Sequence, residues 1–337
     1  MPSLSEARTF NSSYNPTYIP VAVFLGGTGG IAASTAEHLS RYTNGKLHVI
    51  IAGRNRVDGA RVLESLVKPL EHQTPTSELL REFVFCDASS LASVHTAGET
   101  ISELLAERLP HSKPRINFLV LSAPHFNLIS SYETVDGLDR QLMMRYYHRF
   151  KMAYELMPLL RVARDEGQDA KVLSILASGF SFPFDPNNFG FKNLGVIGQY
   201  TKAFRTVFAS ATYMDIIIEE FASREQGISF TNLYPGVVRT AQLDWAFQKH
   251  WLFTPFRPFF DFFMKLTSMS VEDSGEWVLF SLLDAKAEGK GFYRRGEHGE
   301  EYNPGEFDSH ARKVVREQLF DHSILETRAE ELVDSSS

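Results

Sequence analysis

Apolar residues recur along the chain in two alternating patterns. Short apolar runs, several of them ending in glycine or a polar residue, predict buried strands. These runs are residues 21–25, 47–52, 82–86, 116–121, 171–176, 228–233 and 291–293. Between them, apolar positions spaced three and four residues apart predict helices. These segments are 31–42, 58–70, 90–109, 136–163, 197–224 and 271–283. Such alternation favours an α/β fold in which helices cover both faces of a doubly wound parallel sheet.

The pattern continues without a break in composition or an internal repeat, which indicates a single domain over residues 19–325. Two additions are expected: an aromatic-rich lid at about 241–268 and a C-terminal helix near 309–320. The polar ends, residues 1–18 and 326–337, are expected to be mobile tails.

Composition narrows the class of protein. The 337 residues carry a net charge of −7, which argues against nucleic-acid binding. The single cysteine, Cys86, excludes an intramolecular disulfide and a zinc site built on cysteines. No histidine or carboxylate cluster has metal-ligand spacing, so no metal is expected. The N-terminus lacks the apolar core of a signal peptide, and no apolar run is long enough for a transmembrane helix. A cytoplasmic protein is therefore expected.

The strongest chemical signal is the glycine-rich string between the first strand and the first helix. Gly26, Gly29 and Gly30 let the backbone turn sharply and approach a pyrophosphate. The free N–H groups at the start of the helix then favour the negative charge. A glycine string in this position predicts a dinucleotide site in a Rossmann-like fold.

Two further segments refine this site. Arg54 and Asn55 follow the second strand, where an arginine suits the 2′-phosphate of NADP rather than the free hydroxyl of NAD. We therefore expect NADP(H), with a solvated loop arginine as the alternative interpretation. Asp87 and Ala88 follow the third strand, and Asp87 is expected beside the adenine ring.

Over about residues 21–293 the chain resembles the short-chain dehydrogenase/reductase family, through the glycine turn, Asp87 and the Pro-Gly-x-x-x-Thr string at 235–240. The resemblance implies that the glycine turn and Asp87 hold the cofactor, and that the Pro-Gly segment contacts its nicotinamide end. Carried to this sequence, these roles fall on Gly26, Thr28, Gly30, Ile31, Asp87, Pro235, Gly236 and Thr240, and we add Gly29, Ala88 and Val238 as neighbours. The family's Asn-Asn-Ala-Gly after the fourth strand is replaced here, so that only Ser122 and Ala123 could keep the backbone contacts to the cofactor ribose. Residues 140–160 and 274–276 resemble a filamentous-fungal branch common in secondary-metabolite pathways.

In that family a tyrosine acts as general acid/base, assisted by a lysine four residues later. Here Tyr200 can take the tyrosine role, but Phe204 occupies the lysine position and Lys202 comes two residues early. Residues two apart do not face each other on a helix. Lys202 could therefore assist only before the helix begins, and Tyr200 could equally be an ordinary surface or core residue.

The family's serine and asparagine also differ. Ala177 falls on the serine position, so that Ser178 serves only after a one-residue shift; otherwise it simply opens a turn. Arg145 replaces the asparagine. Its permanent charge could polarise a carbonyl or stabilise an oxyanion, unless it merely pairs with an acid on the helix surface.

Three functions follow from this pattern. The first is an NADP(H)-dependent oxidoreductase that acts on a carbonyl, imine or enone of a bulky apolar substrate, with a rearranged catalytic set. The second is a non-redox isomerase, cyclase or dehydratase on the same fold, and the third is a cofactor-binding protein without turnover. The aromatic lid favours an apolar ligand, but it could also be a packed core or an interface. A homodimer or homotetramer is left open.

Overall fold

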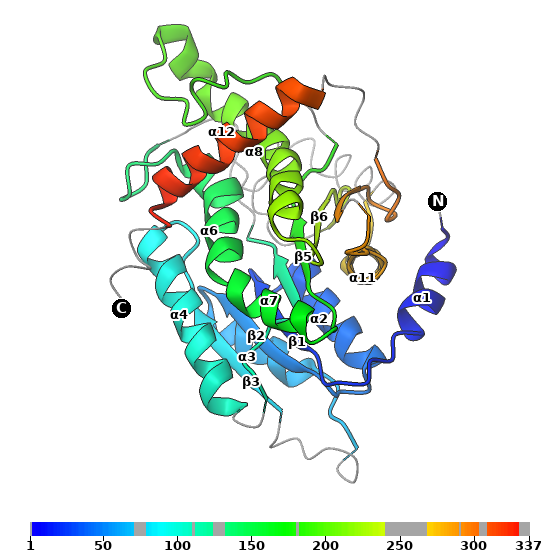
Figure 1. Cartoon of the computed structure of the whole chain (residues 1–337). Helices are drawn as coiled ribbons and strands as arrows, with labels where there is room; N and C mark the ends of the chain where they lie inside the picture. The colour runs from blue at the N-terminus through cyan, green and yellow to red at the C-terminus, as the bar shows by residue number, and fades with distance from the viewer. Residues whose placement is uncertain are drawn as a thin grey trace, which may run out of the picture.

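Seven parallel strands form one sheet, which lies at the centre of the described part of the chain (Figure 1). The computed structural model describes residues 2–70, 79–109, 112–123, 132–179, 182–239, 268–289, 291–302 and 309–329. The strands are β1 Val21–Leu25, β2 His48–Gly53, β3 Arg81–Phe85, β4 Phe118–Leu121, β5 Lys171–Ile175, β6 Ser229–Leu233 and β7 Phe292–Arg295. Their order is β3-β2-β1-β4-β5-β6-β7. The order reverses between β1 and β4, which confirms the predicted doubly wound fold.

Helices cover both faces of the sheet. They are α1 Leu4–Ser12, α2 Gly30–Tyr42, α3 Arg56–Ser65, α4 Leu91–Arg108, α5 Arg140–Leu142, the π-helical turn η2 Met143–Tyr147, α6 His148–Glu155, α7 Met157–Asp165, α8 Val196–Arg224, α11 Val271–Leu283 and α12 Ser309–Thr327. Successive strand residues point to opposite faces. Val23 thus packs beneath α4, α6 and α8, whereas Phe24 packs beneath α2 and α11.

Element boundaries differ from the predicted ones where side chains intervene. The helix expected over 58–70 begins at Arg56, because the Asn55 side chain accepts hydrogen bonds from the first backbone N–H groups. Residues 136–163, where one long helix or two abutting ones are expected, hold two abutting stretches: α5, η2 and α6 run on continuously, and α7 follows with Pro158 in its first turn. Proline fits there because the first helical N–H groups lack intrahelical partners.

The structure corrects the expectation of a mobile N-terminal tail. Residues Ser3 and Glu6 form a capping box at the start of α1, and α1 packs against α11. Asn11 is fully buried, and its amide donates to the backbone oxygen of Glu276 at 3.0 Å and to its carboxylate at 2.9 Å. Composition could not reveal this, because the partner lies 265 residues away.

The C-terminal helix is longer than expected. α12 continues to Thr327 and so includes the first residues of the tail predicted at 326–337. Phe320 packs edge-on against Phe150 and Phe221, with ring centroids 5.4 and 5.6 Å apart. These contacts join α12 to α6 and α8. Residues 330–337 lie outside the described part of the chain.

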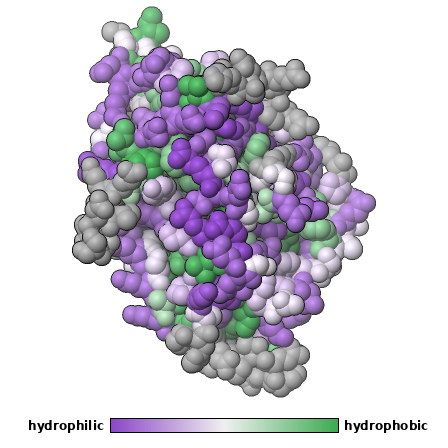
Figure 2. Space-filling model, in the orientation of Figure 1, coloured by the Kyte–Doolittle hydropathy of each residue, from purple (hydrophilic) through white to green (hydrophobic). Residues whose placement is uncertain are grey.

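On the face drawn in Figure 2, hydrophilic side chains cover most of the described surface and apolar ones form small separate groups. No helix among the described residues is long and apolar enough to cross a membrane. The lid expected at about 241–268 lies outside the described residues except for Ser268, which precedes α11.

Candidate active site

The glycine turn joins β1 to α2 at the carboxyl edge of the sheet. Gly26 has a φ of +78°, and its N–H donates to the carbonyl of Ala52 at 2.8 Å. A Cβ at Gly26 would lie 2.6 Å from the carbonyl carbon of Ser122 and 2.7 Å from the nitrogen of Ala123. The turn therefore lies directly against the chain that leaves β4, and only glycine fits this position.

The start of α2 is open. No side chain among the described residues caps the helix, and a Cβ at Gly29 would meet nothing within 4 Å. The first N–H groups of a helix have no intrahelical acceptors and carry a partial positive charge. An uncapped start beside an open glycine is therefore suited to a phosphate group, as the sequence predicts.

Arg54 and Asn55 lie next to this turn but have different roles. Arg54 is exposed and makes no hydrogen bond or ion pair with the described residues, so its guanidinium is available to a ligand. Asn55 instead uses its amide oxygen to cap α3, accepting from the nitrogens of Val57 at 3.0 Å and Asp58 at 3.3 Å. The structure thus gives Asn55 a structural role that the sequence did not suggest.

The remaining cofactor candidates surround the same edge of the sheet. Asp87 follows β3, and one of its carboxylate oxygens accepts from the backbone and hydroxyl of Ser89 at 2.9 and 2.8 Å. Ala88 beside it is buried. Gly236 follows β6 with a φ of +71°, and the next residues pair with the segment before α11, where Met269 donates to the carbonyl of Val237 at 2.9 Å. Thr240 lies outside the described residues.

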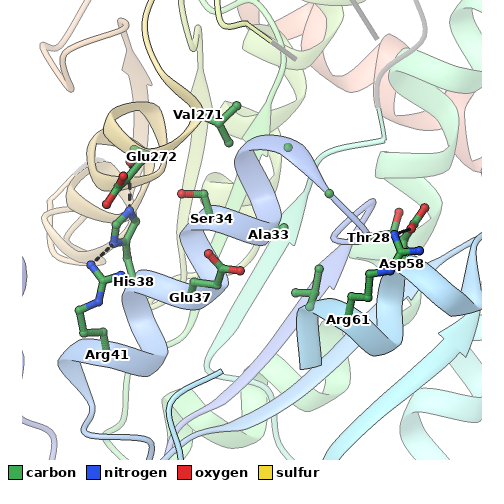
Figure 3. A pocket seen from close by; sticks show the side chains of 13 residues that line it. Thr28, Ala33, Ser34, Glu37, His38, Arg41, Asp58, Arg61, Val271 and Glu272 are labelled. Carbon is green, nitrogen blue, oxygen red and sulfur yellow. Dashed lines mark hydrogen bonds and ion pairs between the residues drawn. The ribbon is translucent and has the colours of Figure 1, made fainter. Parts of the chain in front are cut away.

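A cavity of about 560 Å³ adjoins the glycine turn (Figure 3). It extends from Thr28 along α2 to His38, and α3 and α11 line its sides. His38 hydrogen-bonds the carbonyl of Glu272 and the guanidinium of Arg41. The lining does not include Ser122 or Arg145, so this cavity lies beside the start of α2 and away from the reaction centre that the sequence predicts.

The proposed catalytic residues do not converge. Tyr200 lies on the first turns of α8 and is 87% exposed, while the Nζ of Lys202 pairs with the Oδ2 of Asp139 at 3.6 Å. Figure 1 shows that the first turns of the long helix α8 extend past the body of the molecule. Ser178 is buried, and its hydroxyl donates to Asp215 at 3.2 Å. The structure therefore does not support a Tyr200–Lys202–Ser178 centre.

Asp215 is a residue that the sequence analysis missed. Its carboxylate accepts from the Ser178 hydroxyl, from the Gly179 nitrogen at 2.8 Å and from the Asn232 side chain at 2.8 Å. Burial raises its pKa, and the nearby Arg294 and these hydrogen bonds oppose that shift. Asp215 thereby holds the loop after β5 against β6, which explains why the Ser178 hydroxyl is not free for a substrate.

Arg145 lies in the interior, as the functional interpretation requires, rather than on the helix surface. It is 7% exposed within η2, and its Nε donates to the Oγ of Ser210 on α8 at 2.9 Å. Burial lowers its pKa to about 10. π-helical turns frequently occur at functional sites, and η2 is where this arginine contacts α8 through Ser210.

Comparisons with known proteins agree with this architecture. No family model matches the chain. It is 30% identical to the oxidoreductase andH of Emericella variicolor over 292 residues, which cover 85% of this chain and 76% of that protein. It is 28% identical to the oxidoreductase AN1596 of Emericella nidulans over 290 residues, 85% of this chain and 78% of that protein.

The chain belongs to the short-chain dehydrogenase/reductase family. Its fold is that of the family: the NADPH-bound carbonyl reductase from chicken fatty liver superposes with a TM-score of 0.55. That match covers 85% of this chain and 98% of the other at 18% identity. The family assignment from the glycine turn is therefore confirmed, and this member is an enzyme of the dehydrogenase/reductase kind.

Proposed function

We propose that the protein is an NADP(H)-dependent oxidoreductase that acts on a carbonyl, imine or enone of a bulky apolar substrate. The observation that carries this proposal is the open, uncapped start of α2 beside Gly29. A pyrophosphate placed there would accept hydrogen bonds from the first N–H groups of α2. The bound cofactor would supply or accept the hydride.

Arg54 supports the preference for NADP(H). It is exposed beside the turn and has no partner among the described residues, so that a 2′-phosphate would not compete with an internal carboxylate. The carbonyl reductase from chicken fatty liver, a fold relative, was solved with NADPH.

Arg145 is the residue we propose to act on the substrate. Its buried guanidinium would donate hydrogen bonds to the substrate oxygen and stabilise negative charge as it develops there. Tyr200 would not take part, because its phenol lies on an exposed turn of α8.

A second candidate function is a non-redox reaction on the same fold. It is favoured by one observation, that neither Tyr200 nor Ser178 offers a free hydroxyl to the space beside Arg145. In that case Arg145 would act electrostatically on an isomerisation, cyclisation or dehydration, and a cofactor would not be consumed. A protein that binds the cofactor without turnover is the remaining alternative.

Fluorescence titration with NADPH and NADH tests the cofactor assignment. We expect Arg54→Ala to weaken NADPH binding by about 10- to 100-fold, since a charge-assisted hydrogen bond contributes about 1.5–3 kcal/mol. NADH binding should stay within about threefold, because it has no 2′-phosphate for Arg54 to contact. Arg108→Ala is the control, since Arg108 is an exposed arginine on α4 that pairs with Glu82 and does not line the cavity beside the glycine turn. Equal NADPH affinity in both variants would refute the role of Arg54.

Turnover is tested with a panel of apolar ketones and enones, by following the loss of NADPH absorbance. Arg145→Met should reduce kcat by about 100-fold or more, as for the loss of an oxyanion-stabilising donor, while NADPH affinity is retained. If NADPH binds but no compound in the panel consumes it, the redox proposal fails. Conversion of a substrate without any cofactor would establish the non-redox candidate instead.

A further inference from the structure

Arg149 is a buried cation that the proposed mechanism does not use. It lies on α6 one turn after Arg145 and is fully buried. Its Nη1 donates to the carbonyl of Leu121 at 2.5 Å and to the hydroxyl of Ser174 at 2.8 Å. Its Nε and Nη2 have no hydrogen-bond partner among the described residues.

Two other buried cations among the described residues, Lys151 and Arg294, have carboxylate partners, and Arg149 differs from them. Lys151, two residues later and equally buried, pairs with the carboxylate of Glu155 at 2.7 Å. Arg294 pairs with the buried carboxylate of Glu219. Arg149 makes no ion pair with a described carboxylate, and the like charge of Arg145 acts on it. Burial, and secondly this like charge, lower the pKa of Arg149 to about 9.

The two guanidiniums, one helical turn apart in the interior, carry like charge and repel each other. A buried cation without a counter-charge is expensive for a protein to keep. The presence of Arg149 in the interior therefore indicates that an anion binds beside it in the functional complex.

The position of Arg149 indicates where that anion would come from. Leu121 ends β4, and Ser174 is the penultimate residue of the neighbouring strand β5. The next residue, Ser122, lies against the glycine turn. Ligands of open α/β sheets bind just beyond the carboxyl ends of such strands, at the point where the strand order reverses. Arg149 thus lies beneath the expected meeting point of cofactor and substrate.

We propose that Arg145 and Arg149 together form a receptor for an anionic oxygen of the substrate: a carboxylate, enolate or phenolate. Arg145 binds the oxygen directly. Arg149 is a fully buried positioning residue. Its charge attracts the anion, and its hydrogen bonds to Leu121 and Ser174 hold the ends of β4 and β5. This rests on the proposed function, since it takes the bound molecule to be the substrate, and it adds that the apolar substrate carries an ionised oxygen.

The test compares benzoate with benzamide, which has nearly the same shape but no charge. Binding of each is measured by isothermal titration calorimetry at constant ionic strength, with the protein both free and loaded with NADPH. Wild-type protein should bind benzoate about tenfold or more tightly than benzamide. Arg149→Met should lose most of that difference, while Arg149→Lys, which keeps the charge, should retain it within about threefold.

Lys151→Met is the matched control, because it removes an equally buried cation from the same helix that already has a carboxylate partner. It should leave the ratio of benzoate to benzamide affinity unchanged. A merely structural role of Arg149 would weaken both probes together in Arg149→Met and leave their ratio intact, which would overturn the proposal. Equal binding of the two probes to wild-type protein would also overturn it.

Two further measurements keep the outcome clear. If Arg149→Met does not fold, Arg145→Met serves in its place, and it should abolish the preference for benzoate. NADPH titration of the same samples tests the proposed NADP(H)-dependent function separately from the anion receptor. If wild-type protein does not bind NADPH, the proposed function is refuted. The ratio of benzoate to benzamide affinity in cofactor-free protein would still test the anion receptor.

Discussion

Replacing Gly26 by alanine should destabilise the protein even without cofactor. Gly26 combines a φ of +78° with the closest approach of the turn to the end of β4. The new Cβ would lie 2.6 and 2.7 Å from backbone atoms of Ser122 and Ala123. These atoms cannot rotate away as a side chain would, because the Ser122 nitrogen donates to the carbonyl of Leu25 at 2.8 Å.

Two costs add in this variant. The left-handed backbone conformation costs alanine about 1–2 kcal/mol, and forcing a methyl group into a packed site costs about 1–3 kcal/mol more. We therefore expect the free energy of unfolding to fall by about 2–5 kcal/mol. That is a large share of the roughly 5–15 kcal/mol that stabilises a typical domain. The shift of β4 needed to relieve the contact would also move Ser122 at the cofactor site.

The assay is urea unfolding of the free protein, followed by circular dichroism, together with NADPH titration of the folded variant. Gly29→Ala is the matched control in the same turn: its φ is 172°, which is extended backbone, and its Cβ would meet nothing within 4 Å. Its stability should stay within about 0.5 kcal/mol of wild type. The reasoning is wrong if the two variants unfold at the same urea concentration.

Three other variants test packing and protonation. Phe320→Ala should lower the free energy of unfolding by about 3–5 kcal/mol. Leu325 is 77% exposed on the same helix, so Leu325→Ala should change it by under about 0.5 kcal/mol. Equal shifts in the melting temperature would contradict the packing of α12. Asn11→Ala should cost about 1–3 kcal/mol in urea unfolding, because it removes the amide that donates to the buried carboxylate of Glu276. No loss of stability would mean that α1 is not docked. Burial, and then Arg115, lower the pKa of His48 from 6.5 to about 4, so the unfolded chain binds a proton that the folded one does not, and stability should fall by about 2 kcal/mol from pH 7 to pH 5. His48→Asn should remove that part of the pH dependence, and an unchanged slope would refute it.

The order of strands and helices could be predicted from the sequence because it depends on local periodicity. The apolar run at β1 alternates between the two faces of the sheet, and the spacing in α2 presents one apolar side to it. Boundaries that depend on side-chain caps or on partners far along the chain could not be read this way. Asn55 shortens the loop before α3, and Asn11 docks α1 through a residue near the other end of the chain.

The cofactor half of the candidate site, which stays a prediction, rests on residues adjacent in sequence, whereas the catalytic half depends on tertiary structure. The glycine turn needs residues that are adjacent in sequence, so the string itself reveals it. The catalytic positions depend on which face of α8 meets the sheet. Spacing suggested Tyr200, but the structure leaves it exposed and brings Ser210 of the same helix to Arg145. The sequence shows that Arg149 follows Arg145 by four residues, but only the structure shows that both arginines are buried.

The sequence by itself determined the family and the doubly wound sheet, because each of these rests on short patterns of residues. Only the tertiary structure decided which side chains share one space beyond β4 and β5. Burial and charge compensation are properties of that space: a guanidinium such as Arg149 is ordinary on a surface and costly in the interior. The anion expected at Arg145 and Arg149 follows from that difference.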